Sequence, residues 1–336
     1  MAPLATVAIL SIGEMGMGIA KLLVAHNYRV VTNLEGRSWG TTKTPTRELK
    51  RHPSKPSPPT SPSSQNPTTS YLSSPTRRSL NRNPHQHRLQ QPTKPQENPL
   101  YFLDLNAISP RSARSIAEIF STNAPAITFL DGCIIGNAPS QKPTPTPNTT
   151  EARHHPKTSL TWSKPSIPIS GSIASVPASF AHLSEILNFK HISDDVGMAS
   201  GLKCCFATMT KGFTALCIQA FTTASNLGVL PILMEEMEAK FPALLKTAER
   251  GVTSMPPKAY RWVKEMEEIS AAHEEDGGFE SAGKGLFNEV AKVYESVADD
   301  SVLGEEKTER RKRGLTIEDV AAAMGEGNAA KRKKSA

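Results

Sequence analysis

The feature that most constrains this 336-residue chain is an apolar run that ends in closely spaced glycines, VAILSIGEMGMGIA at residues 7–20. An apolar strand followed by glycines and a helix is typical of the first turn of a dinucleotide-binding domain. Gly13 and Gly16 have no Cβ, so the main chain can approach a pyrophosphate at the following helix N-terminus. Ser11 replaces the first glycine of the Gly-x-Gly-x-x-Gly pattern, so a simple strand-to-helix turn is an equal alternative from this segment alone.

The residues after this turn predict a βαβ unit. A helical segment leads to a second apolar run at residues 28–32, and a right-handed crossover makes the two strands parallel neighbours. The second run ends in NLEGRS at residues 33–38, where such sites bind the ribose of the cofactor. Glu35 indicates NAD, whereas Arg37 and Ser38 indicate the 2′-phosphate of NADP. A polar turn with no ligand is the alternative.

Several segments resemble the β-hydroxyacid dehydrogenase and 6-phosphogluconate dehydrogenase superfamily, in a fungal-type branch. They are IGEMGMGIAKLL (12–23), YFLDLNAISP (101–110), ITFLDGCIIG (127–136), PSIPISG (165–171) and GMASGLKCCFATMTKG (197–212). The resemblance implies an α/β plus all-α chain, with a Rossmann-type parallel sheet followed by a helical, phosphogluconate dehydrogenase-like domain. It also implies NADP-dependent hydride transfer from a hydroxyl-bearing carbon of a small molecule, with NAD less favoured, and a homodimer.

The resemblance assigns chemistry to single residues, Lys203 first. Lys203 matches the lysine that serves the superfamily as general acid and base, because a desolvated ammonium has a lowered pKa and can exchange a substrate proton. Without the resemblance, a helix lysine that covers apolar surface is the simpler interpretation. The predicted cofactor-binding residues are Ser11, Ile12, Gly13, Glu14, Met15, Gly16, Arg37, Ser38 and Asn106. The predicted substrate residues are Ser109, Asp131, Gly132 and Gly136.

Three departures from the superfamily pattern weaken the prediction of a small hydroxyacid substrate. Ile135 and Asn137 replace the usual serine and second glycine of the substrate loop. Ala207 replaces the asparagine four residues after the catalytic lysine. A site for a carboxylate has therefore lost hydrogen-bonding groups, and the substrate is not predicted.

Residues 41–98 are rich in Pro, Ser, Thr, Gln and Asn, with ten Lys or Arg against two acidic residues. Such a composition does not bury enough apolar surface to offset the entropy of ordering. It predicts that the further sheet strands needed here are absent. Three explanations for this segment remain: a natural disordered insertion, an unspliced intron, or translation in a wrong reading frame. The last two are artefacts of gene prediction, and an artefact is favoured. A broken sheet would make the chain a degenerate, non-enzymatic relative, at most a helical association module.

The predicted domain limits follow from these shifts in composition. Residues 1–40 and 99–171 form the dinucleotide-binding domain, residues 172–300 the helical domain, and residues 301–336 a basic tail.

Apolar residues at helical spacing predict a long helix, and most of them are expected in the core: Leu202, Phe206, Met209, Phe213, Leu216 and Ala220. Further helices are expected at residues 231–250, 257–272 and 285–298. Lys203 and Lys211 interrupt the apolar run and argue against a membrane span, and no chemical role is predicted for Lys211.

Charge and cysteine content disfavour other functions. The basic excess of residues 41–98 accounts for the net charge of +7, and Tyr71 is the one aromatic residue there, so nucleic-acid binding is disfavoured. The four cysteines have no zinc spacing, which predicts no metal and a reducing, cytoplasmic location. Basic clusters at residues 310–313 and 331–334 could address the nucleus, but a solvated tail is favoured. A short capped helix is expected between them, at residues 316–324.

Overall fold

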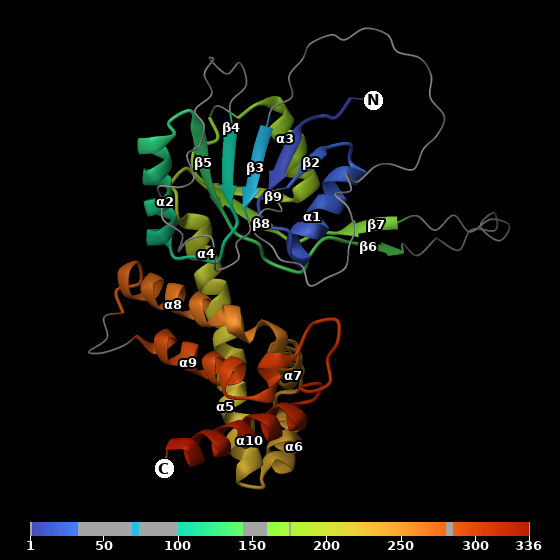
Figure 1. The fold of residues 1–336 in the computed structure, drawn as a ribbon, viewed down its shortest axis with the longest axis vertical. Helices are drawn as coiled ribbons and strands as arrows, with labels where there is room; N and C mark the ends of the chain where they lie inside the picture. The colour runs from blue at the N-terminus through green and yellow to red at the C-terminus, as the bar shows by residue number, and fades with distance from the viewer. Residues whose placement is uncertain are drawn as a thin grey trace, which may run out of the picture.

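The structure is a computed structural model that describes residues 2–32, 69–73, 100–143, 160–174, 176–279 and 285–335. It has an α/β domain at one end and a helical domain at the other, joined by one long helix (Figure 1). The strands are β1 (Thr6–Ile9), β2 (Arg29–Val31), β3 (Thr69–Ser73), β4 (Leu100–Asp104), β5 (Ile127–Gly132), β6 (Ser140–Pro143), β7 (Leu160–Ser163), β8 (Ile167–Ser170) and β9 (Phe189–Ser193).

The helices divide between the two domains. The helices packed around the sheet are α1 (Glu14–Ala25), α2 (Pro110–Asn123) and α3 (Ala178–Leu187). The long helix consists of α4 (Met198–Ala207), a π-helical turn η2 (Thr208–Gly212) and α5 (Phe213–Asn226). The helical domain continues with α6 (Leu230–Lys240), α7 (Pro242–Ser254), η3 (Pro256–Lys258), α8 (Ala259–Glu275), α9 (Leu286–Asp299), η4 (Val302–Glu305) and α10 (Ile317–Ser335).

The main sheet is continuous, with the strand order β2-β1-β3-β4-β5-β8-β9. The predicted β1–α1–β2 unit is present, with β1 and β2 parallel. The prediction that residues 41–98 hold no sheet strand is wrong, because β3 pairs in parallel with both β1 and β4. Thr69, Tyr71 and Leu72 favour extended backbone, and the strand supplies partners for backbone groups of β1 and β4 that burial would leave unpaired. The rest of that segment lies outside the described residues.

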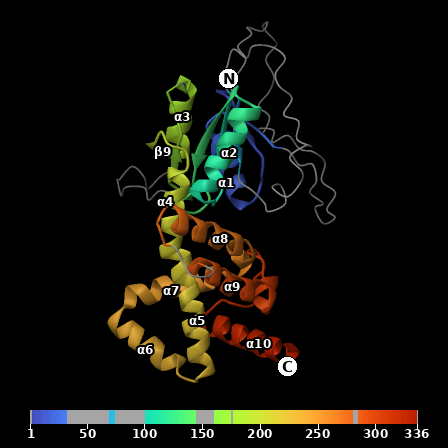
Figure 2. The same ribbon diagram turned by 90° about the vertical axis from the view of Figure 1, so that its left-hand side faces the viewer.

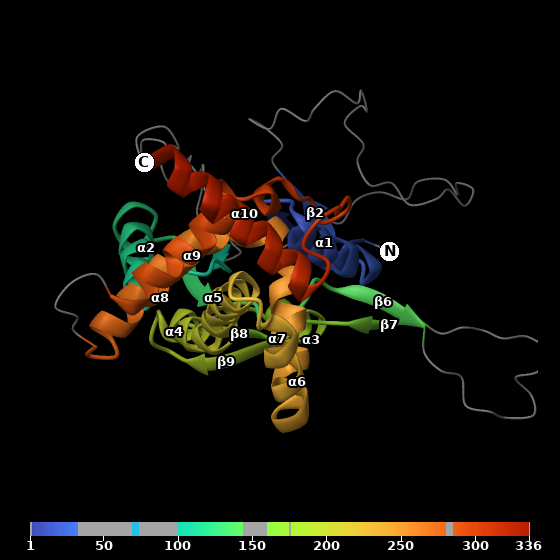
Figure 3. The same ribbon diagram turned by 90° about the horizontal axis from the view of Figure 1, so that it is seen from below.

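The α/β domain extends beyond the predicted limit at residue 171. Strand β9 pairs in parallel with β8 at the edge of the main sheet, and α3 precedes it in the chain. The core of this domain forms where α1 and α3 cover the sheet, and Val7, Leu23 and Leu130 are fully buried in it. A separate hairpin of β6 and β7 projects beside α1, which Figure 3 shows from the helical end.

The long helix exposes much of the apolar stripe that was expected in the core. Leu202, Phe206, Met209 and Leu216 are 41–76% exposed. The buried side chains lie on the other faces of the helix and include Ala207, Ala215, Ile218 and Phe221. The prediction failed because the helix is apolar on more than one side, and periodicity alone cannot tell which side is covered. By length and composition, Met198–Asn226 is also the one described helix that could cross a membrane, with 44% of its most apolar window buried in the protein.

Two other predictions about the C-terminal part need correction. The expected single helix at residues 231–250 is divided at Phe241 into α6 and α7, because Pro242 cannot continue the hydrogen bonding of the preceding turn. Residues 301–335, predicted as a basic tail, belong to the helical domain, although the basic residues 331–334 are exposed as expected. Helix α10 packs on α5, and Ile317, Val320 and Met324 lie in the core of the helical domain. Figure 2 shows α10 beside α5, with α6 and α7 on the opposite side.

The carboxylate of Asp131 joins the sheet to the long helix. Asp131 ends β5 fully buried, and it accepts hydrogen bonds from Gly197 N (3.1 Å), Ser200 N (2.9 Å) and Ser200 Oγ (2.6 Å) at the start of α4. Ser170 Oγ of β8 donates to the same carboxylate (3.0 Å) and accepts from Ala199 N (3.0 Å). The first amides of α4 are thus satisfied by the sheet, where a negative charge also suits the helix dipole.

We expect Asp131→Ala to lower the free energy of unfolding by about 3 kcal/mol or more, because buried donors on both sides of the joint lose their acceptor. Ser170→Ala removes one bond of the same network and should cost about 1 kcal/mol. Urea denaturation monitored by circular dichroism measures both variants. If both variants lost only a small and equal amount of unfolding free energy, the carboxylate would not be what holds the sheet and the long helix together.

Candidate functional site

The turn between β1 and α1 has the backbone geometry of a phosphate-binding turn. Gly13 is the N-cap of α1, and no side chain of residues 2–32 or of the other described ranges caps this helix end. A Cβ on Gly13 would meet no atom of the described residues within 4 Å, whereas a Cβ on Gly16 would lie 2.4 Å from the carbonyl oxygen of Ser11. Gly16 is therefore required for close packing of the helix on the turn, and Gly13 leaves open space in front of the first amides.

The other predicted residues of this turn take different positions. Ser11 is buried, Ile12 and Met15 pack against the core of the α/β domain, and Glu14 is exposed in the first turn of α1. Glu14 lies close enough to Lys258 of η3 for their charges to interact. Arg37 and Ser38, which were predicted to bind the 2′-phosphate of NADP, lie outside the described residues.

Two buried carboxylates lie at the ends of the adjacent parallel strands β4 and β5, on the same edge of the sheet as this turn. Asp104 of β4 pairs in register with Asp131 of β5, and burial, with the nearby charge of Asp131, raises the pKa of Asp104 to about 6. Asn106 N donates to Asp104 Oδ1 (2.9 Å). The side-chain oxygen of Asn106 is itself buried and has no hydrogen-bond partner among the described residues. Such an atom is expected where a ligand supplies the missing donor.

Ser109 links the two domains. It caps α2 by accepting from Ser112 N, and its own N and Oγ donate to Glu268 Oε2 on α8 (3.0 and 2.9 Å). Ser112 Oγ donates to the same oxygen (2.8 Å). Burial alone would raise the pKa of Glu268, but these bonds and the charge of Lys264 hold it below its ordinary value. The hydroxyl predicted to meet substrate is thus engaged in a contact between α2 and α8.

The predicted substrate residues at the end of β5 have packing roles in the structure. The carboxylate of Asp131 is occupied by the joint with α4. A Cβ on Gly132 would meet the side chains of Leu103 and Leu105, and Gly136 has a φ of +124°, which favours glycine. None of the three lines the cavity described next, within the part of the chain that the structure describes.

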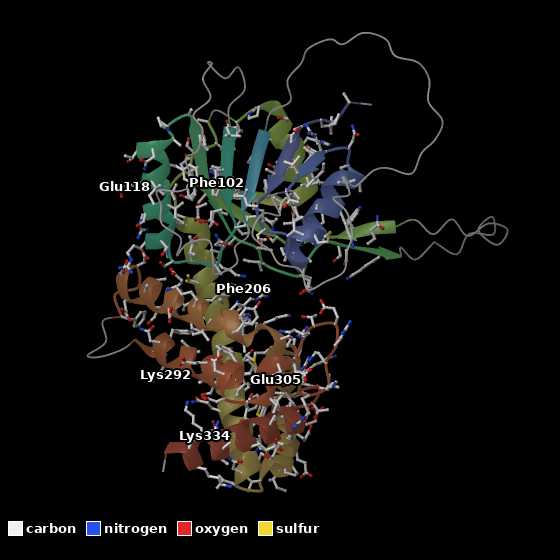
Figure 4. The ribbon with its side chains drawn as sticks, viewed as in Figure 1. Phe102, Glu118, Phe206, Lys292, Glu305 and Lys334 are labelled. Carbon is white, nitrogen blue, oxygen red and sulfur yellow. The ribbon has the colours of Figure 1, made fainter. Side chains whose placement is uncertain are left out.

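Lys203 lies at a cavity between the domains. Its Nζ donates to the carbonyl oxygen of Ile134 (2.7 Å), in the loop that follows β5. Burial lowers the pKa of Lys203 below the ordinary lysine value of 10.5. The cavity is small, with room for about one water molecule, and it is lined by Ala107, Lys203, Cys204, Ala207, Glu265 and Ile269. Figure 4 labels Phe206 at this level, where the long helix leaves the α/β domain.

Sequence patterns alone did not identify Glu265, the second charged residue of the cavity. Glu265 is on α8 and pairs with Lys211, which is 54 positions earlier in the chain. The sequence signal was limited to Lys211, a charge within an otherwise apolar helix. In the described residues, no group of His, Cys, Asp and Glu side chains could hold a metal ion, and the cysteines there are all free.

The comparisons with known proteins identify the fold. A family model described as a domain of unknown function (DUF1932) matches residues 224–297. No curated protein sequence matches the chain. A conserved hypothetical protein from Sinorhizobium meliloti 1021 is 17% identical with a TM-score of 0.53, and the match covers 96% of this chain and 97% of that one. The 3-hydroxyisobutyrate dehydrogenase of Mycobacterium tuberculosis, solved with L-serine, is 12% identical with a TM-score of 0.50, covering 96% and 99%. The predicted fold is thereby confirmed.

The raised pKa of Asp104 predicts a specific pH dependence of stability. Its carboxyl binds a proton more tightly in the folded chain, with a pKa of about 6, than at its ordinary value of 3.8. The stabilising effect is therefore complete below pH 4 and is lost as the pH rises through 6, a change of about 3 kcal/mol. The free energy of unfolding of Asp104→Asn, relative to that of wild type, should therefore increase by about this amount between pH 4 and pH 7.

Denaturant titrations at several pH values measure this difference. Asp195→Asn, at an exposed carboxylate, is the control and should follow wild type at every pH. A constant difference between Asp104→Asn and wild type across this range would contradict the account.

Proposed function

We propose that this chain, which has the fold of the 3-hydroxyisobutyrate dehydrogenases, is an NADP-dependent oxidoreductase of the β-hydroxyacid dehydrogenase type. In this proposal it transfers hydride between the cofactor and a hydroxyl-bearing carbon of a small molecule. The observation that carries the proposal is Lys203, a lysine of lowered pKa at a cavity between the domains. The 3-hydroxyisobutyrate dehydrogenase noted above was solved with L-serine, and the proposal extends only the class of reaction to this chain.

The β1–α1 turn fits the diphosphate of a nicotinamide nucleotide. Among the described residues, Gly13 leaves open space at the helix N-terminus, and no side chain caps the amides there. An anion is favoured at such an end by the amides and by the helix dipole. The unpartnered side-chain oxygen of Asn106, at the end of β4, suits an N–H donor of the same ligand. When bound, the nicotinamide accepts or gives the hydride.

Lys203 is proposed to handle the proton of the reaction. A general base must be neutral to accept the proton of a substrate hydroxyl, and burial favours the neutral amine. The carbonyl of Ile134 fixes the position of Nζ at the cavity wall, so the same atom can return the proton in the reverse direction. Ser109 and Asp131 contribute by fixing the elements that carry Asn106 and Lys203.

The preference for NADP rests on Arg37 and Ser38 in the sequence, and Glu35 is the argument for NAD. The homodimer is also part of the proposal. The exposed apolar residues of the long helix, Leu202, Phe206, Met209 and Leu216, form a surface of the kind that a second copy covers. The non-enzymatic alternative depended on a broken sheet, and β3 removes that premise. A cytoplasmic location stays a prediction.

Gly13→Ala tests the cofactor site without disturbing the fold. The added Cβ meets no atom in the part of the chain that the structure describes, and Gly13 has a φ of −104°, so the melting temperature should stay at the wild-type value. The methyl group would meet a bound diphosphate, so the affinity for NADPH should fall at least about 10-fold, or roughly 1.4 kcal/mol. Titration followed by nicotinamide fluorescence measures the affinity. Unchanged binding would place the cofactor elsewhere.

Lys203→Met tests the proposed base. We expect turnover of hydroxyl substrates with NADP⁺ to fall by about 10²- to 10⁴-fold, with NADPH affinity unchanged, because only proton transfer is lost. In wild type, the oxidation rate should rise with pH and level off below the ordinary lysine pKa of 10.5, since burial favours the neutral amine. Lys190→Met, at an exposed lysine, is the control. A variant that keeps the wild-type rate would exclude Lys203 as the base.

A further inference from the structure

Two cations of the helical domain lie close together without an acidic partner. Lys258 ends η3 and is half-buried, and Arg261 lies in the first turn of α8 and is exposed. Neither side chain forms a hydrogen bond or an ion pair within the part of the chain that the structure describes. Burial lowers the pKa of Lys258 below the ordinary value of 10.5, and the charge of Arg261 lowers it further. We refer to these two residues as the basic pair.

The surroundings of the basic pair add positive charge. After the larger effect of burial, the charge of Arg261 also lowers the pKa of Lys203. The charge of Arg311 acts in the same way on Lys258. Arg311 donates to the carbonyls of Thr253 and of Gly314, so its charge is fixed beside η3. The helical domain thus concentrates cations on the side that meets the α/β domain.

Helix α8 lies across the end of the α/β domain. Its C-terminal end is below α2 in Figure 1, where Asp276 pairs with Arg114 (3.1 Å). Further along the same helix, Glu268 accepts three hydrogen bonds from the start of α2. Arg261 is two turns before Glu268, on the same face of the helix and about 10 Å nearer its N-terminal end. The face of α8 that contacts the α/β domain therefore includes Arg261.

The β1–α1 turn lies at the matching distance. Strands β1 and β4, which lead into α1 and α2, are separated in the sheet by β3 alone. With about 4.8 Å between neighbouring strands, the ends of β1 and β4 are roughly 10 Å apart. The charge of Lys258 interacts with that of Glu14, in the first turn of α1, so the N-terminal end of α8 points toward α1. The basic pair therefore faces the turn that contains Gly13.

Stability does not explain the basic pair. Two like charges close to each other lower the free energy of unfolding, and neither gains a hydrogen bond from the described residues in return. Residues that break a rule of folding in this way are expected at functional sites. The missing partner is an anion that meets Lys258, Arg261 and the first amides of α1 together.

A diphosphate is the anion that fits this position. It has two negative charges, one for each cation, and its oxygens accept hydrogen bonds from backbone amides, from lysine and from arginine. A substrate carboxylate has one charge and would leave one of the two cations unpaired. Glu14 would repel a diphosphate bound at its own helix end, and a cation beside Glu14 offsets that repulsion.

We propose that Lys258 and Arg261 bind the diphosphate of the nicotinamide cofactor from the side opposite α1. The cofactor is then held by both domains, and its binding fixes α8 against the α/β domain. This inference rests on the proposed function, because it completes the site of the same cofactor with residues of the helical domain.

Lys258→Met with Arg261→Met tests the basic pair. We expect the affinity for NADPH to fall by about 10- to 100-fold, because two hydrogen bonds to charged groups are lost. The melting temperature should stay at the wild-type value or rise, because the repulsion between the cations is removed. Titration followed by nicotinamide fluorescence measures the affinity, and circular dichroism measures the melting temperature.

Lys333→Met with Lys334→Met is the matched control. It removes the same net charge from the exposed end of α10, and Figure 4 labels Lys334 at the end of the helical domain remote from the α/β domain. The control should bind NADPH with the wild-type affinity.

Glu14→Gln separates contact with the diphosphate from simple neutralisation of Glu14. This variant should bind NADPH more tightly than wild type, because it removes a negative charge from the turn. If Lys258 contacts the diphosphate, Lys258→Met should lower the affinity in the Glu14→Gln background as well. An effect of Lys258→Met that disappears in this background would overturn the contact.

Inorganic pyrophosphate tests the phosphate site apart from the rest of the nucleotide. We expect it to displace NADPH from wild type, with a dissociation constant that rises 10-fold or more in the 258/261 double variant. A pyrophosphate dissociation constant that is the same in both chains would contradict the inference.

The outcomes separate this inference from the function on which it rests. A 258/261 double variant that binds NADPH as wild type does would overturn the inference and leave the proposed function intact. So would an equal loss of affinity in the 333/334 control, which would reveal a general effect of net charge. A folded wild-type chain that does not bind NADPH would overturn the proposed function, and the inference with it.

Discussion

The buried carboxylate of Asp131 is the interaction on which the placement of the site depends. It lies at the end of β5 and accepts hydrogen bonds from the first turn of α4 and from Ser170 of β8. A helix N-terminus carries unpaired amides, and burial makes their satisfaction obligatory. The chain meets this need with a side chain of the sheet, so the long helix starts at a fixed point. Lys203 follows within two turns, where its Nζ reaches the loop after β5.

A second set of contacts closes the other side of the cavity. Glu268 of α8 accepts three hydrogen bonds from Ser109 and Ser112 at the start of α2. Glu265 is three residues earlier on the same helix, so it lies on the same face of α8 and lines the cavity. The cavity walls therefore come from both domains, with Ala107 from the α/β domain, Lys203 from the long helix and Glu265 from α8. Burial of these charges is the cost of excluding water from the reacting groups.

The sequence predicted the parts of the fold that local patterns determine. The β1–α1–β2 unit, β4, β5 and the lysine helix follow from short apolar runs, glycines and helical periodicity. The cap at residues 316–319 was also predicted, and Asp319 N does donate to Thr316 Oγ1 (3.2 Å). Strand β3 was missed because its surroundings are rich in Pro and Ser, and tertiary pairing decides its conformation.

The site was harder to predict because its contacts are distant in sequence. Asp131 and Ser109 lie in the segments that resemble the superfamily, but their partners, Ser200 and Glu268, are 69 and 159 positions away. Lys211 stood out as a charge in an apolar helix, whereas nothing in the sequence indicated that Glu265 would be its partner. The apolar periodicity correctly predicted the long helix, but it did not predict which side is buried. Burial depends on which other elements pack against the helix.

A crystal structure of the chain with NADP⁺ bound tests the central claim most directly, that one nucleotide connects the β1–α1 turn to the cavity between the domains. The account predicts the diphosphate at the first amides of α1, beside Gly13, and the nicotinamide ring next to Asn106 with Lys203 Nζ facing its reactive carbon. A nucleotide bound elsewhere, or a nicotinamide remote from Lys203, would contradict the account.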